Sequence, residues 1–165
     1  MRSITVSDIS SFSLAPQAIS ISEMAVRMLL ACGFGFIIGI DREMHSRPAG
    51  LRTNMLTALA ACVFAIIAFE MIASLETSND GVRLDPIRVV EAVTAGVAFL
   101  AAGTIIQARG DVRGLTTGAG MWLAGAIGLA CGSGFITIAL FGTLFALIIL
   151  IPVKLLERWI PDKEE

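Results

Sequence analysis

Five long apolar runs dominate the chain and restrict the folds open to it. They lie at about Ser22–Ile40, Thr53–Ser74, Pro86–Ile106, Leu115–Cys131 and Phe135–Leu155. A run of about 20 apolar residues crosses the hydrocarbon core of a bilayer as a helix. Strands of a membrane barrel would alternate polar and apolar residues, and segments such as FGTLFALIIL show no alternation. The sequence therefore predicts an all-α integral membrane protein with five transmembrane helices.

Composition agrees with a lipid environment. The chain has 165 residues, of which 56% are hydrophobic and 16% charged, with a mean hydropathy of +0.83. A soluble domain of this size could not bury so much apolar surface. The net charge of −2 and the lack of a basic tail give no reason to expect a nucleic-acid partner. No nucleophile–base pair is visible in the sequence, so we expect no enzymatic activity.

Lys and Arg residues predict the orientation, because they collect on the cytoplasmic side of membrane proteins. One side of the five spans carries Arg42, Arg47, Arg52, Arg109, Arg113, Lys154, Arg158 and Lys163. The other side carries Arg2 and Arg83, with Arg27 and Arg88 just inside helix ends. We therefore expect a polar tail outside (1–21), a five-helix membrane domain (22–156) and a short cytoplasmic tail (157–165).

Small residues at helical spacing predict close packing between the spans. Gly35 and Gly39 are four residues apart, as are Gly128 and Gly132. This spacing lets two helix backbones approach closely in lipid. Such surfaces allow contacts within one chain or between two copies, so the sequence is compatible with a homo-oligomer and does not require one.

Three charged residues fall inside predicted spans, where charge is costly and is usually functional. Arg27, Glu70 and Glu91 all lie about one turn from the predicted outer surface. They could neutralise one another across the bundle, line a polar cavity that opens outward, or extend to the interface individually. In the third span, one helical face carries Glu91, Thr94, Ala95, Ala98, Ala102 and Ile105. Because this face is small and partly polar, we expect Glu91 and Thr94 to point into the bundle.

A second charged group gathers at the predicted cytoplasmic ends of the spans: Asp41, Arg42, Glu43, Arg52 and Arg113. Arginines here are explained by topology alone, but acidic residues contribute nothing to that signal. Asp41 and Glu43 could serve as ligands for Mg²⁺, which takes one or two carboxylates and keeps several waters. The alternatives are a contact surface for a partner, or a positive anchor with incidental acids.

Three blocks in order resemble the MgtC/SapB family of bacterial inner-membrane proteins: GFIIGIDREMHSRPAGLRTNMLTALAA, VVEAVTAGVAFLAAGTII and RGDVRGLTTGAGMWLAGAIGLACG. The family's A-G-L-R-T is matched by Ala49 to Thr53, and the glycines of its third-span block by Gly96 and Gly103, which we expect to pack helices. Ala101 and Gly118 depart from the family's Gly and Ala at those positions. Some relatives also carry a soluble domain after the membrane part.

The resemblance implies a role in magnesium limitation and, in a pathogen, in virulence. The first hypothesis is that the chain is a non-enzymatic accessory or regulatory protein for magnesium and membrane-energy homeostasis. The partner would be the membrane ATP synthase or a Mg²⁺ transporter, and the charged cytoplasmic group would be the contact or ion-sensing site. The alternative is a Mg²⁺ transporter or channel, with Glu91 and Glu70 at the outer end of its pathway and Asp41 and Glu43 at the inner end.

Overall fold

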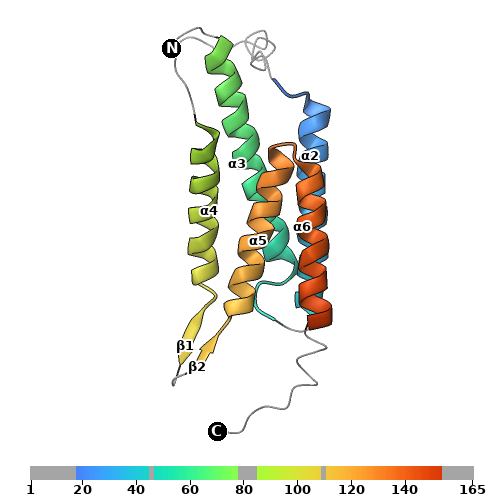
Figure 1. Cartoon of the computed structure of the whole chain (residues 1–165), viewed down its shortest axis with the longest axis vertical. Helices are drawn as coiled ribbons and strands as arrows, with labels where there is room; N and C mark the ends of the chain where they lie inside the picture. The colour runs from blue at the N-terminus through green and yellow to red at the C-terminus, as the bar shows by residue number, and fades with distance from the viewer. Residues whose placement is uncertain (1–17, 45–46, 78–84, 109–110, 154–165) are drawn as a thin grey trace, which may run out of the picture.

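The computed structural model describes residues 18–44, 47–77, 85–108 and 111–153, and these form an elongated helical bundle (Figure 1). The helices run almost the full length of the molecule, and a small hairpin extends from one end of it (Figure 1). The elements in chain order are α2 (Ile21–Met44), α3 (Leu51–Thr77), α4 (Pro86–Ala102), β1 (Ile106–Ala108), β2 (Asp111–Arg113), α5 (Leu115–Gly132), α6 (Ile136–Ile148) and a π-helical turn, η1 (Ile149–Val153).

Helix α5 is the centre of the bundle and packs against α2, α3, α4 and α6. Consecutive helices run antiparallel, so α3 and α5 run in the same direction (Figure 1). We call the end where α2 stops and α3 and α5 begin the Arg42 end, and the opposite one the Arg27 end. The α4 helix packs mainly on α5 and only weakly on α3.

Glycines allow the backbones of three helices to meet. The residues concerned are Gly35 and Gly39 in α2 and Gly128 and Gly132 in α5. A Cβ atom on Gly35 would lie 2.7 Å from the Asn54 carbonyl oxygen in α3, and one on Gly128 would collide with the Ala58 backbone. Any larger side chain would force the helices apart, so these positions fix α2 and α5 against α3.

Two other predicted packing glycines behave differently. A Cβ atom on Gly96 would meet nothing within 4 Å, so Gly96 packs against nothing in the described part of the chain. Gly103 follows the last residue of α4, and its added Cβ would meet only the carbonyl oxygens of Leu100 and Phe99 in its own helix. Within the described part of one chain, these two glycines do not pack one helix on another, and packing between two copies stays a prediction.

Three helices are long and apolar enough to cross a membrane: α2, α3 over Leu51–Ser74, and α5. Large apolar side chains on the outside of the bundle are exposed, among them Leu29, Phe64 and Phe99. A surface of this kind is typical of a protein that faces lipid. The α4 and α6 helices have 17 and 13 residues, below the length of about 20 that a full span needs.

The structure departs from the sequence prediction at two places: the end of the third predicted span and the end of the last helix. The third helix ends at Ala102, and Ile106, Gln107 and Ala108 pair with β2 in an antiparallel hairpin. The all-helical class is confirmed apart from this hairpin. The last helix loses regular α-helical geometry after Ile148, because Pro152 lacks a backbone N–H and cannot continue the ladder.

Candidate functional site

Arg42 lies at the centre of the charged group that the sequence singles out, but it is buried. Only 4% of Arg42 is exposed. Its Nη1 donates to Thr117 Oγ1 (3.0 Å), and its Nη2 donates to the Thr116 carbonyl oxygen. Gly120 makes room, since a Cβ there would lie 3.0 Å from Arg42 Nη2. A buried guanidinium must be hydrogen-bonded, so Arg42 joins α2 to the first turn of α5 and is not part of an open mouth.

Glu43 lies one residue further along and has a different role. Its carboxylate accepts a hydrogen bond from the Leu51 backbone N–H (3.1 Å), the first residue of α3. The N–H groups of a first helical turn have no partner within the helix, so this contact caps α3. Asp41 is half-buried on the other side of Arg42. The two acids are thus placed on either side of a buried cation.

A polar pocket of about 530 Å³ opens at the Arg42 end. It is lined by Glu43, Gly50, Leu51, Arg52 and Thr53. Arg52 is exposed there, whereas Arg113 is an exposed residue of the hairpin and does not line this pocket. The predicted five-residue cluster is therefore divided: Glu43 and Arg52 share a pocket, and Arg42 faces α5.

Asn54 bonds the backbone of Gly50 in the lining of this pocket, and sequence reasoning did not identify it. It is 1% exposed, and its Nδ2 donates to the carbonyl oxygens of Ala49 (2.7 Å) and Gly50 (3.0 Å). Ala49 has a positive φ of 54°, which is unusual for a non-glycine residue. Asn54 therefore holds the turn between α2 and α3 in place. Its Oδ1 is a buried oxygen without a hydrogen-bond partner among the described atoms.

As a signal, Asn54 is a polar residue inside an apolar run, and it falls on the face of α3 that carries Ala58 and Cys62. Thr116 and Thr117 have no sequence signal of their own beyond the family block that contains them. Their contact with Arg42 depends on how α5 lies against α2, which one sequence does not show.

Within residues 18–44, 47–77, 85–108 and 111–153, metal ligation by Asp41 and Glu43 gains no third carboxylate or thiol, and His45 lies outside the described residues. Among the described residues, no group of three or more His, Cys, Asp or Glu side chains could hold a metal ion. One oxygen of Glu43 is already an acceptor for Leu51. Mg²⁺ needs only one or two protein carboxylates, so the described residues at this end can contact a hydrated ion, although they do not by themselves form a closed metal site.

The three charged residues of the predicted outer set do not form one network. Arg27 pairs with Glu23 in its own helix (2.5 Å) and donates to the carbonyl oxygen of Gly132, the last residue of α5. Glu70 accepts from the backbone N–H groups of Ala18 and Ile19, both at 2.9 Å. Arg27 and Glu70 therefore bond backbone atoms at or beside a helix end.

Glu91 is exposed on α4, and the direction predicted for its face was wrong. The α4 helix buries Val93, Val97 and Ala101, while Glu91 lies on the exposed side. Val97 fits against Gly125 of α5, where an added Cβ would lie 2.7 Å from its Cγ2 atom. The β-branched residues rather than the small polar face thus pack on α5. Thr94 is half-buried beside a small cavity of about 100 Å³.

Comparison with known proteins gives consistent results. The model of the MgtC family matches residues 28–159. The Escherichia coli K12 protein named "Putative magnesium transporter YhiD" is 36% identical over 129 residues, which are 78% of this chain and 60% of that protein. Bacillus subtilis SapB is 34% identical over 76% of this chain and 54% of its own length. Brucella abortus MgtC is 39% identical over 67% of this chain and 43% of its own length.

The chain spans about 60% of the length of the first relatives that it matches. No solved structure matches it. The match to the family model covers most of the chain, from the second turn of α2 through α3, α4, α5, α6 and η1. The chain belongs to the MgtC family.

Proposed function

We propose that this protein is a multi-pass inner-membrane protein with its Arg42 end in the cytoplasm and a regulatory, non-enzymatic role in magnesium limitation. The excess of Lys and Arg at that end supports the orientation, and the antiparallel order of consecutive helices is compatible with five spans. The magnesium link rests on the family and on the name of the Escherichia coli relative.

The polar pocket at the Arg42 end is the observation that carries the regulatory role. Glu43 and Arg52 present opposite charges around a space of about 530 Å³. Asn54 bonds the carbonyl oxygens of Ala49 and of Gly50, which lines the pocket, and Arg42 holds the adjoining helix end. A rigid, exposed, charged surface is suited to contact with another protein. The family resemblance offers the membrane ATP synthase or a Mg²⁺ transporter as that partner.

Transport of Mg²⁺ by the chain itself is the second candidate, favoured by the name of the relative and by the unpartnered buried oxygen of Asn54. Two features weigh against it. Glu70 and Glu91 do not meet, since one bonds backbone amides and the other is exposed on α4. The α3–α5 interface is closed by backbone contact at Gly128 and Gly132, which leaves no width there for a hydrated ion.

Growth of a deletion strain in low magnesium tests the regulatory surface. Arg52→Gln should remove complementation while leaving expression and membrane insertion unchanged, because Arg52 is exposed and lines the pocket. Arg47→Gln is the matched control, since Arg47 is exposed in the turn that precedes α3 but does not line the pocket. Equal growth of both variants with wild type would contradict the proposal.

Magnesium flux into liposomes separates the two candidates. The purified protein should give no flux above empty vesicles when an internal indicator is used. Flux that Asp41→Asn and Glu91→Gln both abolish would replace the regulatory proposal by the transport one.

A further inference from the structure

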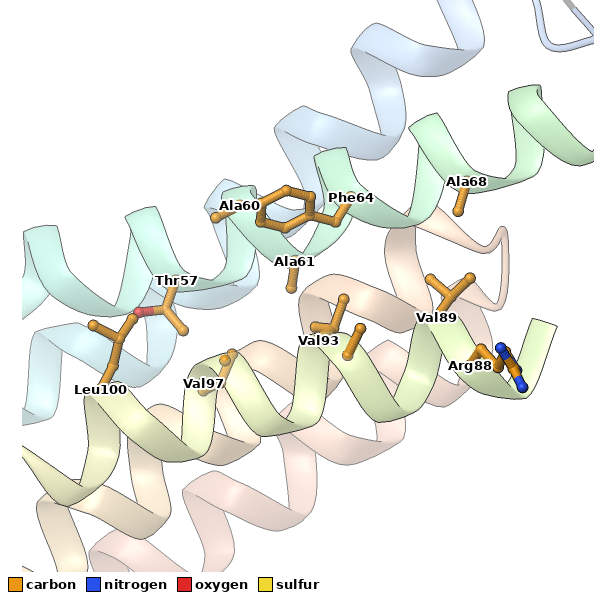
Figure 2. Close-up of a pocket in the computed structure, with 12 residues that line it drawn as sticks. Thr57, Ala60, Ala61, Phe64, Ala68, Arg88, Val89, Val93, Val97 and Leu100 are labelled. Atoms are coloured by element: carbon orange, nitrogen blue, oxygen red, sulfur yellow. The ribbon is translucent and has the colours of Figure 1, made fainter. Parts of the chain in front are cut away.

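A long apolar groove separates α3 from α4. Its volume is about 610 Å³, within the range of small-molecule sites of about 300–1,000 Å³. It is lined by Thr57, Ala60, Ala61, Phe64 and Ala68 of α3 and by Arg88, Val89, Ala92, Val93, Gly96, Val97 and Leu100 of α4. Figure 2 shows Arg88 at one end of the groove and Leu100 and Thr57 at the other. The groove exists because α4 rests on α5 and only weakly on α3.

The groove has an open, smooth wall rather than a packed one. Gly96 would accept a Cβ without meeting any atom within 4 Å, and Ala92 beside it is exposed. The floor is formed by Ala61, Val93 and Val97, all buried apolar residues. Such a surface suits a slender, flexible hydrocarbon.

Arg88 is the cation at the end of this groove, and it has no ion-pair partner among the described residues. The nearest acids in sequence are otherwise placed: the Asp85 carboxylate caps α4 by accepting from Ile87 N (2.9 Å), and Glu91 does not line the groove. An arginine at the edge of an apolar surface in a membrane favours an anionic partner, and phosphate oxygens match its donors.

The length of the groove matches one leaflet. From Arg88 to Leu100 the α4 helix rises about 18 Å, at about 1.5 Å per residue. The hydrocarbon core of a bilayer is about 30 Å thick, so a single leaflet is about 15 Å deep. A phosphate held at Arg88 would therefore place an acyl chain of the same lipid along the whole groove.

We propose that this groove is a binding site for one anionic phospholipid, with its phosphate on Arg88 and one acyl chain between α3 and α4. The lipid belongs to the leaflet at the Arg27 end. It fills the space that α4 leaves beside α3 and so sets how far α4 stands from the bundle. A helix from a second copy of the chain is the competing occupant.

Native mass spectrometry of the full chain in mild detergent tests the site, with phosphatidylglycerol as the probe. Wild type should bind one molecule per protomer in a saturable step, and phosphatidylcholine with the same chains should bind more weakly. Arg88→Gln should weaken phosphatidylglycerol binding about tenfold, the effect of losing one charge-assisted hydrogen bond. Arg88→Lys keeps the charge and should retain most of the binding.

Filling the groove should also abolish binding. Gly96→Leu and Ala92→Leu both place a side chain in the open space, and two variants guard against one that fails to fold. Ala98→Leu is the matched control on the same helix, since Ala98 is exposed and does not line the groove. Circular dichroism checks that each variant is folded.

Two results would overturn the proposal. The first is equal phosphatidylglycerol binding in wild type, Arg88→Gln and both groove-filling variants, which would mean a nonspecific lipid annulus. The second is a dimer that Gly96→Leu dissociates without any change in bound lipid, which would make a second copy the occupant.

Discussion

Replacing Thr117 by valine removes one of the two acceptors that hold the buried guanidinium of Arg42. The change keeps the shape of the side chain, so it creates no cavity, and Arg42 retains its bond to the Thr116 carbonyl. A hydrogen bond to a charged group contributes about 1.5–3 kcal/mol, and Arg42 is only 4% exposed, so water does not replace the lost acceptor. We expect the free energy of unfolding to fall by about 2 kcal/mol.

Equilibrium unfolding of the purified protein in detergent, followed by circular dichroism, measures this loss. Thr143→Val is the matched control, because Thr143 is also buried but donates only to the Ala139 carbonyl within its own helix (2.8 Å). It should lower the free energy of unfolding by less than about 1 kcal/mol, since that carbonyl remains in the helix ladder.

A double-mutant cycle isolates the contact itself. Once Arg42→Met has removed the guanidinium, adding Thr117→Val should have little further effect, which corresponds to a coupling of about 2 kcal/mol. Equal losses in Thr117→Val and Thr143→Val, together with additive effects in the cycle, would refute the claim that Arg42 joins α2 to α5.

Two further predictions concern the glycines and the carboxylates. Gly128→Leu should destabilise the bundle by several kcal/mol or prevent folding, because its side chain would collide with the α3 backbone. Gly33→Ala places a methyl group in open space, so it should change the free energy of unfolding by no more than about 1 kcal/mol in the same assay. Similar stability of the two variants would contradict the packing of α5 on α3. Glu70→Gln weakens the acceptor for the backbone amide of Ala18 and should speed hydrogen exchange at that amide. Glu91→Gln is the control, because Glu91 is exposed on α4, and it should leave that exchange unchanged. Unchanged exchange in both variants would contradict the bond between Glu70 and the Ala18 amide.

The helices could be predicted from the sequence because lipid imposes a length on apolar runs, and α2, α3 and α5 follow it. The burial of Arg42 was within reach, since Gly35, Gly39 and Arg42 share one face of a helix that continues past Ile40 to Met44. The sequence prediction put Arg42 in the charged group outside the membrane because it ended the first span at Ile40, where the apolar run ends, whereas the helix continues to Met44.

The sequence did not show which face of α4 packs on the bundle. In water an apolar stripe marks the core, but in lipid both sides of a helix are apolar and periodicity loses that meaning. The small face with Glu91 therefore resembled an interface, while Val97 of the opposite face fits against Gly125. The hairpin after α4 was missed for another reason, because two strands of three residues give almost no periodic signal.

The two arginines of α2 make equivalent contacts with opposite ends of one neighbour. Arg27 and Arg42 lie fifteen residues apart, and so do their acceptors on α5, Gly132 and Thr117. These contacts are about 22 Å apart along the helix axis, and a slide of α2 by one turn would break both at once. The helices α2 and α5 are therefore held in one register by a contact at each end. Any motion of the bundle has to move α2 and α5 together as one unit.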